Sequence, residues 1–292
     1  MVTEPNMTTE AAVYPDLSGS SVCVTGAARG LGLAMADAFA RAGCHVLLLD
    51  LDGDELDRVR PALAARHPGQ VIAAAAAPVS DQDAVTAALT AFTARTGELS
   101  VMVANAGVSA NAPSLDLELD RWNTALDVNL TGVFVCARAA ARIMREGDGG
   151  VILTTSSMYG VTAGPERAAY CATKAAVAAL TKVLAVEWAP SGIRVNALAP
   201  GYVETDLLAR LSDAGRLDTG ALRRRTPRGR LGTPQDIANL ALFLSSGVSA
   251  NITGQVLVSD GGWTADGYAV TPARPDAGRS RGNGGLRGSG PE

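Results

Sequence analysis

Short apolar segments alternate with longer segments of helical periodicity from residue 21 to about residue 260. The short segments have the length and the apolar character of buried strands. The longer segments repeat apolar residues three and four positions apart, which is typical of helices that bury one face. This pattern predicts strands at 21–25, 45–49, 71–75, 100–104, 151–156, 193–198 and 255–258.

Helices are predicted between these strands. Asp81 and the pair Thr233-Pro234 are residue types that begin helices. Strands that are apolar throughout and are each followed by a helix are typical of a parallel sheet covered on both faces. We therefore expect an α/β fold, a doubly wound parallel sheet of about seven strands with helices on both faces. The predicted helices are 31–42, 54–66, 81–96, 120–145, 168–189 and 234–245.

The two ends of the chain lack this alternation. Residues 1–17 contain acidic residues and no apolar run, and we expect a loose leader rather than a secretory signal. Residues 269–292 are rich in Gly, Pro and Arg with almost no apolar content, which predicts a disordered tail. Residues 18–268 are predicted to form a single domain, a size that one α/β domain can reach.

The composition is that of a soluble globular protein. Hydrophobic residues make up 47% of the 292 residues, enough for a sizeable core. Twenty-five Lys and Arg against 29 Asp and Glu give a net charge of −4, which argues against nucleic-acid binding. No apolar run approaches the roughly 18 to 20 residues that span a bilayer, so we expect no membrane contact and a cytoplasmic location.

Cysteine and histidine usage excludes further classes. The four cysteines, Cys23, Cys44, Cys136 and Cys171, are far apart and are predicted to be buried reduced thiols, as suits a reducing cytoplasm. The chain has only two histidines, and neither has another metal ligand at a useful spacing. We therefore expect no metal site and no histidine-based catalytic triad.

A glycine-rich turn joins the first predicted strand to the first helix, with the sequence Thr25-Gly26-Ala27-Ala28-Arg29-Gly30-Leu31-Gly32. Such a turn lets backbone N–H groups approach a pyrophosphate at a helix N-terminus, although a structural turn would explain it too. Asp50 closes the second strand, where a carboxylate can bind the adenosine ribose hydroxyls of NAD. Asp50 therefore favours NAD. Arg29 could instead pair with the 2′-phosphate of NADP, so NADP remains open.

The strongest candidate chemistry is Ser157 with Tyr170 and Lys174. Tyr170 and Lys174 are four residues apart and share a helix face. A nearby ammonium lowers the pKa of a tyrosine from about 10, which suits a general acid/base acting on a secondary alcohol. Ser157 ends the fifth strand and can orient the substrate oxygen. A solvated helix face would explain the pair alone, and the preceding serine favours catalysis.

These motifs together resemble the short-chain dehydrogenase/reductase family, in its single-domain form of roughly 250 residues with a Rossmann-type fold. The resemblance covers about residues 16 to 265. It rests on the glycine-rich turn, Asn105-Ala106-Gly107 at the end of the fourth strand, Asn129, Ser157, Tyr170 with Lys174, and Pro200-Gly201.

The resemblance implies a role for each of these residues. Tyr170 would be the acid/base, Lys174 would lower its pKa and bind the nicotinamide ribose, and Ser157 would polarise the carbonyl. Asn129 would hold a water that links Lys174 to solvent. The implied cofactor-binding residues are Gly26, Arg29, Gly30, Leu31, Gly32, Asp50, Val79, Asn105, Ala106, Gly107, Tyr170, Lys174, Pro200, Gly201, Val203 and Thr205.

One position departs from the family pattern. Pro78 stands where family members usually carry an Asp that bonds the adenine amino group, which leaves the Val79 backbone for that contact. The segment after Thr205 corresponds to a lid that shapes specificity. Its excess of arginines over 210–230 fits either an anionic substrate or a solvated helix face.

We therefore expect an NAD-linked oxidoreductase that interconverts a secondary alcohol and a ketone by direct hydride transfer. The alternative enzyme is an NADPH-dependent ketoreductase of the 3-oxoacyl type, and the alternative from another class is a non-catalytic dinucleotide-binding scaffold. The family resemblance also implies a homo-oligomer, usually a tetramer. The sequence does not name the substrate.

Overall fold

Seven parallel strands form one sheet in the computed structural model, which describes residues 14–215 and 217–267. The strand order is β3-β2-β1-β4-β5-β6-β7, so the chain reverses direction across the sheet between β1 and β4. This confirms the predicted doubly wound sheet. The strands are β1 (Ser21–Thr25), β2 (His45–Asp50), β3 (Ile72–Ala76), β4 (Val101–Ala104), β5 (Gly150–Thr155), β6 (Ile193–Pro200) and β7 (Val256–Ser259).

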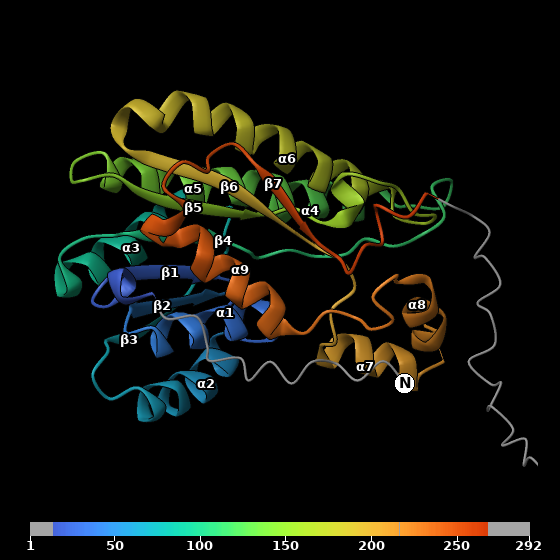
Figure 1. Ribbon diagram of the computed structural model, residues 1–292, viewed down its shortest axis with the longest axis horizontal. Helices are drawn as coiled ribbons and strands as arrows, with labels where there is room; N and C mark the ends of the chain where they lie inside the picture. The colour runs from blue at the N-terminus through green and yellow to red at the C-terminus, as the bar shows by residue number, and fades with distance from the viewer. Residues whose placement is uncertain (1–13, 216, 268–292) are drawn as a thin grey trace, which may run out of the picture.

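Helices cover both faces of the sheet, with α1, α2 and α9 on one side and α3, α5 and α6 on the other (Figure 1). The helices are α1 (Gly30–Arg41), α2 (Gly53–Arg66), α3 (Gln82–Thr96), α4 (Leu119–Leu126), α5 (Gly132–Met144), α6 (Ala168–Trp188), α7 (Asp206–Asp213), α8 (Thr219–Arg225) and α9 (Pro234–Ser245).

The described part of the chain has two main hydrophobic cores, one on each face of the sheet. Successive side chains of a strand pack in opposite cores, so a central strand is apolar throughout. Val22 and Val24 of β1 pack in the core that contains Phe39 of α1, whereas Cys23 packs in the core that contains Phe92 of α3. All of these side chains are buried. A strand buried on both faces has no polar position to alternate with, which explains the uninterrupted apolar segments of the sequence.

The single helix predicted over 120–145 is interrupted. The backbone forms a π-helical turn over Asp127–Thr131 between α4 and α5. The apolar spacing continues on both sides of this turn, so periodicity does not reveal it. The turn places Asn129 in the interior, where its side chain is fully buried. Single π-helical turns inside α-helices are frequent at functional sites.

The predicted loose leader is wrong for its last residues. Pro15–Leu17 form a 3-10 turn, and Leu17 is buried. The Asp16 carboxylate accepts hydrogen bonds from Ser246 Oγ and from the Gly247 N–H at 2.7 Å, and the bond from Gly247 lowers its pKa. The chain is therefore anchored from residue 14. The predictions for residues 1–13 and for the tail from 268 onward lie outside the described residues.

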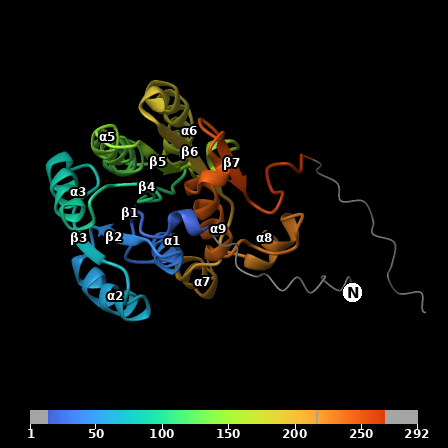
Figure 2. The ribbon, with the colours of Figure 1, turned by 60° about the vertical axis from the view of Figure 1, so that its left-hand side comes forward.

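Two short helices, α7 and α8, were not predicted as separate elements. They follow β6 and lie together beyond the carboxyl ends of the strands (Figure 2). Thr205 caps the start of α7, and Asp218 caps the start of α8 by accepting from Ala221 N–H. These helices form the segment expected to be a lid.

Helix α6 corrects one expectation about apolar runs. The segment Ala168–Ser191 has a mean hydropathy of 1.4 and is long enough to cross a membrane by length and composition alone. The same helix packs against β5 and β6 and carries the candidate residues Tyr170 and Lys174. Core helices of soluble proteins pass the same test, so this finding is weak evidence for a membrane span.

Candidate active site

The glycine-rich turn between β1 and α1 is shaped as a cradle. Gly26 and Gly30 adopt φ values of 63° and 57°, which glycine reaches without steric cost. A Cβ at Gly32 would collide with the carbonyl oxygen of Gly26, so the first turn of α1 sits directly against the turn. Arg29 is the N-cap of α1 and Leu31 is half-buried within it. This close approach of backbone to a helix N-terminus fits a dinucleotide pyrophosphate.

Thr25 ties this cradle to the segment that follows β4. Its hydroxyl accepts hydrogen bonds from the backbone N–H groups of Asn105 and Ala106 at 2.9 and 3.0 Å. Asn105 Nδ2 in turn donates to the Thr25 carbonyl at 2.9 Å. The Asn105 side chain thus holds together the two segments that are predicted to bind the cofactor. The sequence reasoning assigned Asn105 a direct contact and overlooked Thr25.

Asp50 ends β2 next to the cradle. Its carboxylate accepts hydrogen bonds from Ala28 N–H at 2.9 Å and from Asp52 N–H at 3.1 Å. Arg29 forms an ion pair with Asp52, a residue that sequence reasoning did not single out. The arginine expected to compete for a 2′-phosphate therefore already faces a carboxylate.

Val79 follows β3 and is buried, and Cys136 Sγ lies 3.8 Å from its carbonyl oxygen. The nearest carboxylate in the sequence, Asp81, caps α3 by accepting from the N–H groups of Asp83 and Ala84. The Asp81 carboxylate is therefore engaged in capping the N-terminus of α3. The expected adenine contact through the Val79 backbone stays a prediction.

Ser157, Tyr170 and Lys174 come together at the carboxyl end of β5. Ser157 follows the strand and is 5% exposed, and Tyr170 and Lys174 lie in the first two turns of α6. Burial raises the pKa of Tyr170, while a side-chain hydrogen bond from Ser157 and the charge of Arg167 lower it. On balance the pKa of Tyr170 is raised, which corrects the lowering by Lys174 that the sequence led us to expect. Sequence reasoning did not single out Arg167, three residues before the tyrosine.

Lys174 is almost completely buried beside Tyr170. Its ammonium donates to the Thr155 carbonyl at 2.7 Å and lies 5.7 Å from the centroid of the Tyr170 ring. Burial lowers the pKa of Lys174 to about 8. A Cβ at Gly107 would contact both this ammonium and the Asn129 amide oxygen, so a glycine keeps the space between them open.

Asn129 connects the segment after β4 to α6. Its Oδ1 accepts from Val108 N–H at 2.7 Å, and its Nδ2 donates to the Val108 carbonyl at 2.9 Å and to Thr173 Oγ1 at 3.2 Å. Thr173 Oγ1 then donates to the Tyr170 carbonyl. Asn129 therefore positions the backbone that carries Tyr170. The water relay expected for it stays a prediction.

The segment after β6 closes the site on its other side. A Cβ at Gly201 would meet the Asp260 backbone, so the chain passes tightly under β7 after Pro200. Val203 is buried and pairs with Gly232 in an isolated parallel bridge. The Thr205 hydroxyl accepts from Leu208 N–H. These positions bring the segment to the same end of the sheet as Ser157.

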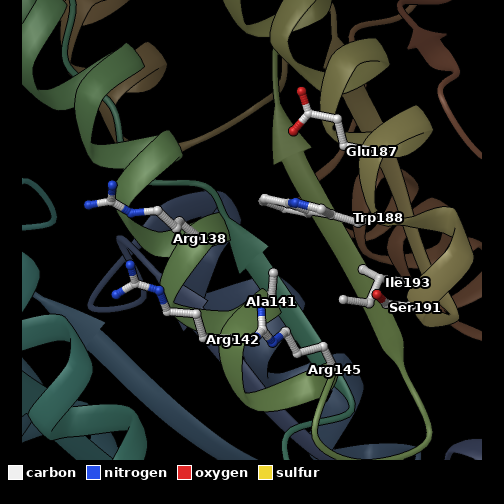
Figure 3. Close-up of a pocket in the computed structure, with 8 residues that line it drawn as sticks. All are labelled: Arg138, Ala141, Arg142, Arg145, Glu187, Trp188, Ser191 and Ile193. Carbon is white, nitrogen blue, oxygen red and sulfur yellow. The ribbon is translucent and has the colours of Figure 1, made fainter.

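A cavity of about 290 Å³ lies away from this site (Figure 3). Its lining includes Arg138 and Arg142 of α5, Arg145 directly after α5, and Glu187 and Trp188 at the end of α6. The lining residue Ile193 begins β6, so this cavity lies at the amino end of the strands. It is therefore separate from the candidate catalytic residues at the carboxyl ends.

Cys23, Cys44 and Cys136 are buried and free, as expected, but Cys171 is only partly buried because it follows Tyr170 at the edge of the site. Burial raises the pKa of Cys44 and of Cys136 to about 12.

Within residues 14–215 and 217–267, no group of three or more His, Cys, Asp or Glu side chains could hold a metal ion.

Comparison with known proteins agrees with this geometry. A sequence model of the family described as Enoyl-(Acyl carrier protein) reductase matches residues 26–264. D-threitol dehydrogenase from Mycolicibacterium smegmatis is 39% identical over 250 residues, covering 85% of this chain and 94% of that protein. An uncharacterised short-chain type dehydrogenase/reductase from Sinorhizobium fredii is 39% identical over 246 residues, and the chain spans 44% of that longer relative.

A solved structure extends the comparison to three dimensions. A gluconate 5-dehydrogenase from Burkholderia cenocepacia J2315, in complex with NADP and tartrate, is 37% identical with a TM-score of 0.79. The match covers 86% of this chain and 98% of that structure.

The chain belongs to the short-chain dehydrogenase/reductase family. It is an NAD(P)-dependent oxidoreductase that interconverts an alcohol and a ketone. Its small-molecule substrate carries a CH–OH group or the corresponding carbonyl.

Proposed function

We propose that Tyr170 is the general acid/base of this reaction and that Ser157 holds the reacting oxygen. One observation carries the proposal: the buried Lys174 ammonium lies 5.7 Å from the Tyr170 ring centroid, and the Ser157 side chain interacts with the phenol of the same residue. The bound nicotinamide supplies or accepts the hydride. Tyr170 removes the hydroxyl proton in oxidation and returns it in reduction.

Replacing Tyr170 by Phe tests this assignment. The variant removes only the phenol oxygen, so we expect cofactor binding within about twofold of the wild type and a kcat reduced by the order of 10²-fold or more. Tyr14→Phe, a phenol removed next to the 3-10 turn of residues 15–17, is the matched control and should leave kcat unchanged. Equal turnover by Tyr170→Phe and wild type would refute the assignment and would favour the scaffold alternative.

We further propose that NAD is preferred over NADP, which the relationship to the NADP-bound gluconate 5-dehydrogenase leaves open. Asp50 and Asp52 place two carboxylates beside the cradle, and Arg29 is paired with the second. A 2′-phosphate would meet both negative charges. NADH should bind at least about tenfold more tightly than NADPH, and Asp50→Ser should reduce that ratio. Tighter binding of NADPH to the wild type would favour the 3-oxoacyl-type ketoreductase alternative.

We propose that the protein is a cytoplasmic homotetramer that binds neither nucleic acid nor membranes. Exposed Val183 and Val186 on α6, which are 51% and 77% accessible, support an interface along this helix. The arginines of the cavity on α5 and Glu187 on α6 supply charges of both signs for a neighbouring copy. The net charge of −4 supports the absence of nucleic acid. A monomer in light scattering at micromolar concentration would exclude the tetramer.

A further inference from the structure

Arg167 occupies a distinctive place beside the proposed catalytic residues. It is the N-cap residue of α6, three residues before Tyr170, and it is half-buried. Its guanidinium carbon lies 5.0 Å from the centroid of the Tyr159 ring, and its Nη1 donates weakly to Asn111 Oδ1 at 3.4 Å. A cation is therefore fixed at the entrance of the site, about one helical turn from the reacting group.

The backbone that directs Arg167 is strained. Glu166 has a φ of 61°, and it is the one residue other than glycine with positive φ among the residues that the structure describes. The Glu166 carbonyl accepts from Ala112 N–H at 3.0 Å, which joins the segment after β5 to the segment after β4. Such conformations cost free energy, and they cluster where a site needs a fixed geometry.

The charge of Arg167 has no carboxylate partner within residues 14–215 and 217–267. Arginines of the lid, in contrast, form ion pairs: Arg223 with Glu204 and Arg225 with Asp266. The two contacts of Arg167, an amide oxygen and an aromatic face, are both neutral. A partly desolvated guanidinium between neutral groups is complementary to a single negative charge.

Aromatic side chains form the wall next to this cation. The Tyr159 and Tyr202 hydroxyls are 2.9 Å apart, and Tyr202 contacts Trp263 edge to face at 5.3 Å between centroids. Tyr159 follows Ser157 by two residues, so the wall begins at the proposed catalytic serine. A ligand between Ser157 and Arg167 would therefore lie along an aromatic surface that ends in a positive charge.

We propose that Arg167 binds a carboxylate of the substrate, so that the enzyme acts on hydroxy acids and the corresponding oxo acids in preference to neutral alcohols and ketones. This inference deepens the proposed function and rests on it. One guanidinium matches the charge of a carboxylate better than that of a phosphate monoester, which carries close to two negative charges. The planar fork of Arg also suits bidentate binding of a carboxylate.

The test compares oxo acids with their carboxamides, which keep the size and remove the charge. Three skeletons are used: an unbranched four-carbon chain, a polyhydroxylated six-carbon chain, and 4-oxocyclohexanecarboxylate. The wild-type enzyme should reduce the acid of at least one pair with a kcat/KM at least about tenfold above that of its amide. In Arg167→Gln this ratio should fall to about one through a higher KM for the acid. Loss of the Arg167 charge also removes one influence that lowers the pKa of Tyr170, and this effect should change kcat for acid and amide alike and cancel in the ratio.

Two further variants separate charge from structure. Arg167→Lys keeps the charge without the planar fork and should retain part of the preference. Arg225→Gln removes the arginine that stacks on Trp263 and is paired with Asp266, and it should leave the acid-to-amide ratio unchanged. Melting temperatures of all variants identify any that fold poorly.

The outcomes separate this inference from the proposed function. If the wild type reduces amides or neutral ketones as well as the acids, the role of Arg167 is refuted while the alcohol–ketone reaction stands. The role is also refuted if Arg167→Gln keeps the preference. If no ketone of the panel is reduced with either cofactor, the proposed function fails on this panel, and the inference fails with it.

Discussion

The floor of the active site and its lid are held by interactions of different kinds. The floor, formed by Asn129, Thr173, Tyr170 and Lys174, consists of largely buried side chains that bond backbone groups of neighbouring segments. The lid, formed by α7 and α8, is held by ion pairs such as Arg223 of α8 with Glu204, whose side chains are 50% and 47% exposed.

The two kinds of contact differ in strength. Exposed ion pairs contribute about 0 to 1 kcal/mol each, whereas removing one partner of a buried hydrogen bond costs about 1 to 3 kcal/mol. The floor therefore keeps its geometry while the lid can move at little cost. The difference suggests that the chemistry is set by the floor and that access and specificity are adjusted around it.

Asn129→Ala should have the largest effect on stability in this comparison. The change leaves the N–H and carbonyl of Val108 and the hydroxyl of Thr173 without their partner in the interior. We expect the free energy of unfolding to fall by about 2 to 4 kcal/mol in urea titrations, with kcat reduced as well. Asn123→Ala, an exposed asparagine of α4, is the control and should change stability by less than about 0.5 kcal/mol. Equal effects of the two substitutions would contradict the distinction between floor and lid.

Lys174→Met should separate stability from activity. Burial lowers the pKa of Lys174 in the folded protein to about 8, from an ordinary value of 10.5, so folding disfavours the charged form. Between these pH values the unfolded chain binds more protons, and the stability of the wild type rises with pH. The variant should therefore be inactive and yet more stable than the wild type by about 2 kcal/mol at neutral pH, after the lost bond to Thr155 is allowed for.

The pH dependence provides the check on this prediction. The stability advantage of Lys174→Met should shrink by about 2 kcal/mol as the pH is raised from about 7.5 to about 9.5, because the wild type then loses its buried charge. An advantage that does not change over this window would mean that Lys174 titrates at its ordinary pH in the folded protein.

Arg223→Gln should have the smallest effect. Its partner Glu204 and its own side chain are both exposed, so solvent already screens the pair. We expect the free energy of unfolding to change by less than about 0.5 kcal/mol in the same urea titrations. A loss comparable to that of Asn129→Ala would show that the lid is fixed as firmly as the floor.

The sequence predicted the sheet well because its central strands, such as β1, β4 and β5, are buried on both faces and all seven strands are short apolar segments. It also singled out Ser157, Tyr170 and Lys174 by their types and spacing, and the structure brings them together at the end of β5, while their roles stay a proposal. The π-helical turn at Asn129 was missed because the apolar spacing continues across it. Thr25 was missed as a connecting residue because its partners lie some 80 positions away, at Asn105 and Ala106.

Arg167 illustrates what sequence spacing leaves undetermined. Its position three residues before Tyr170 is visible in the chain, but arginines at helix starts are common surface residues. Only the structure places its guanidinium against Tyr159 and pairs Arg223 and Arg225 of α8 with carboxylates. The carboxylates that pair with Arg223 and Arg225 lie 19 and 41 positions away in the chain, so sequence spacing does not show which arginine is left for a ligand.

The pH dependence of alcohol oxidation tests the central claim, that Tyr170 transfers the proton, most directly. The wild-type kcat/KM should rise with pH to a plateau through one ionisation, because oxidation needs the phenolate to accept the hydroxyl proton. In Tyr170→Phe the residual rate should lack that ionisation. A Phe variant that keeps the same ionisation as the wild type would contradict the account, because a group other than Tyr170 would then carry the proton.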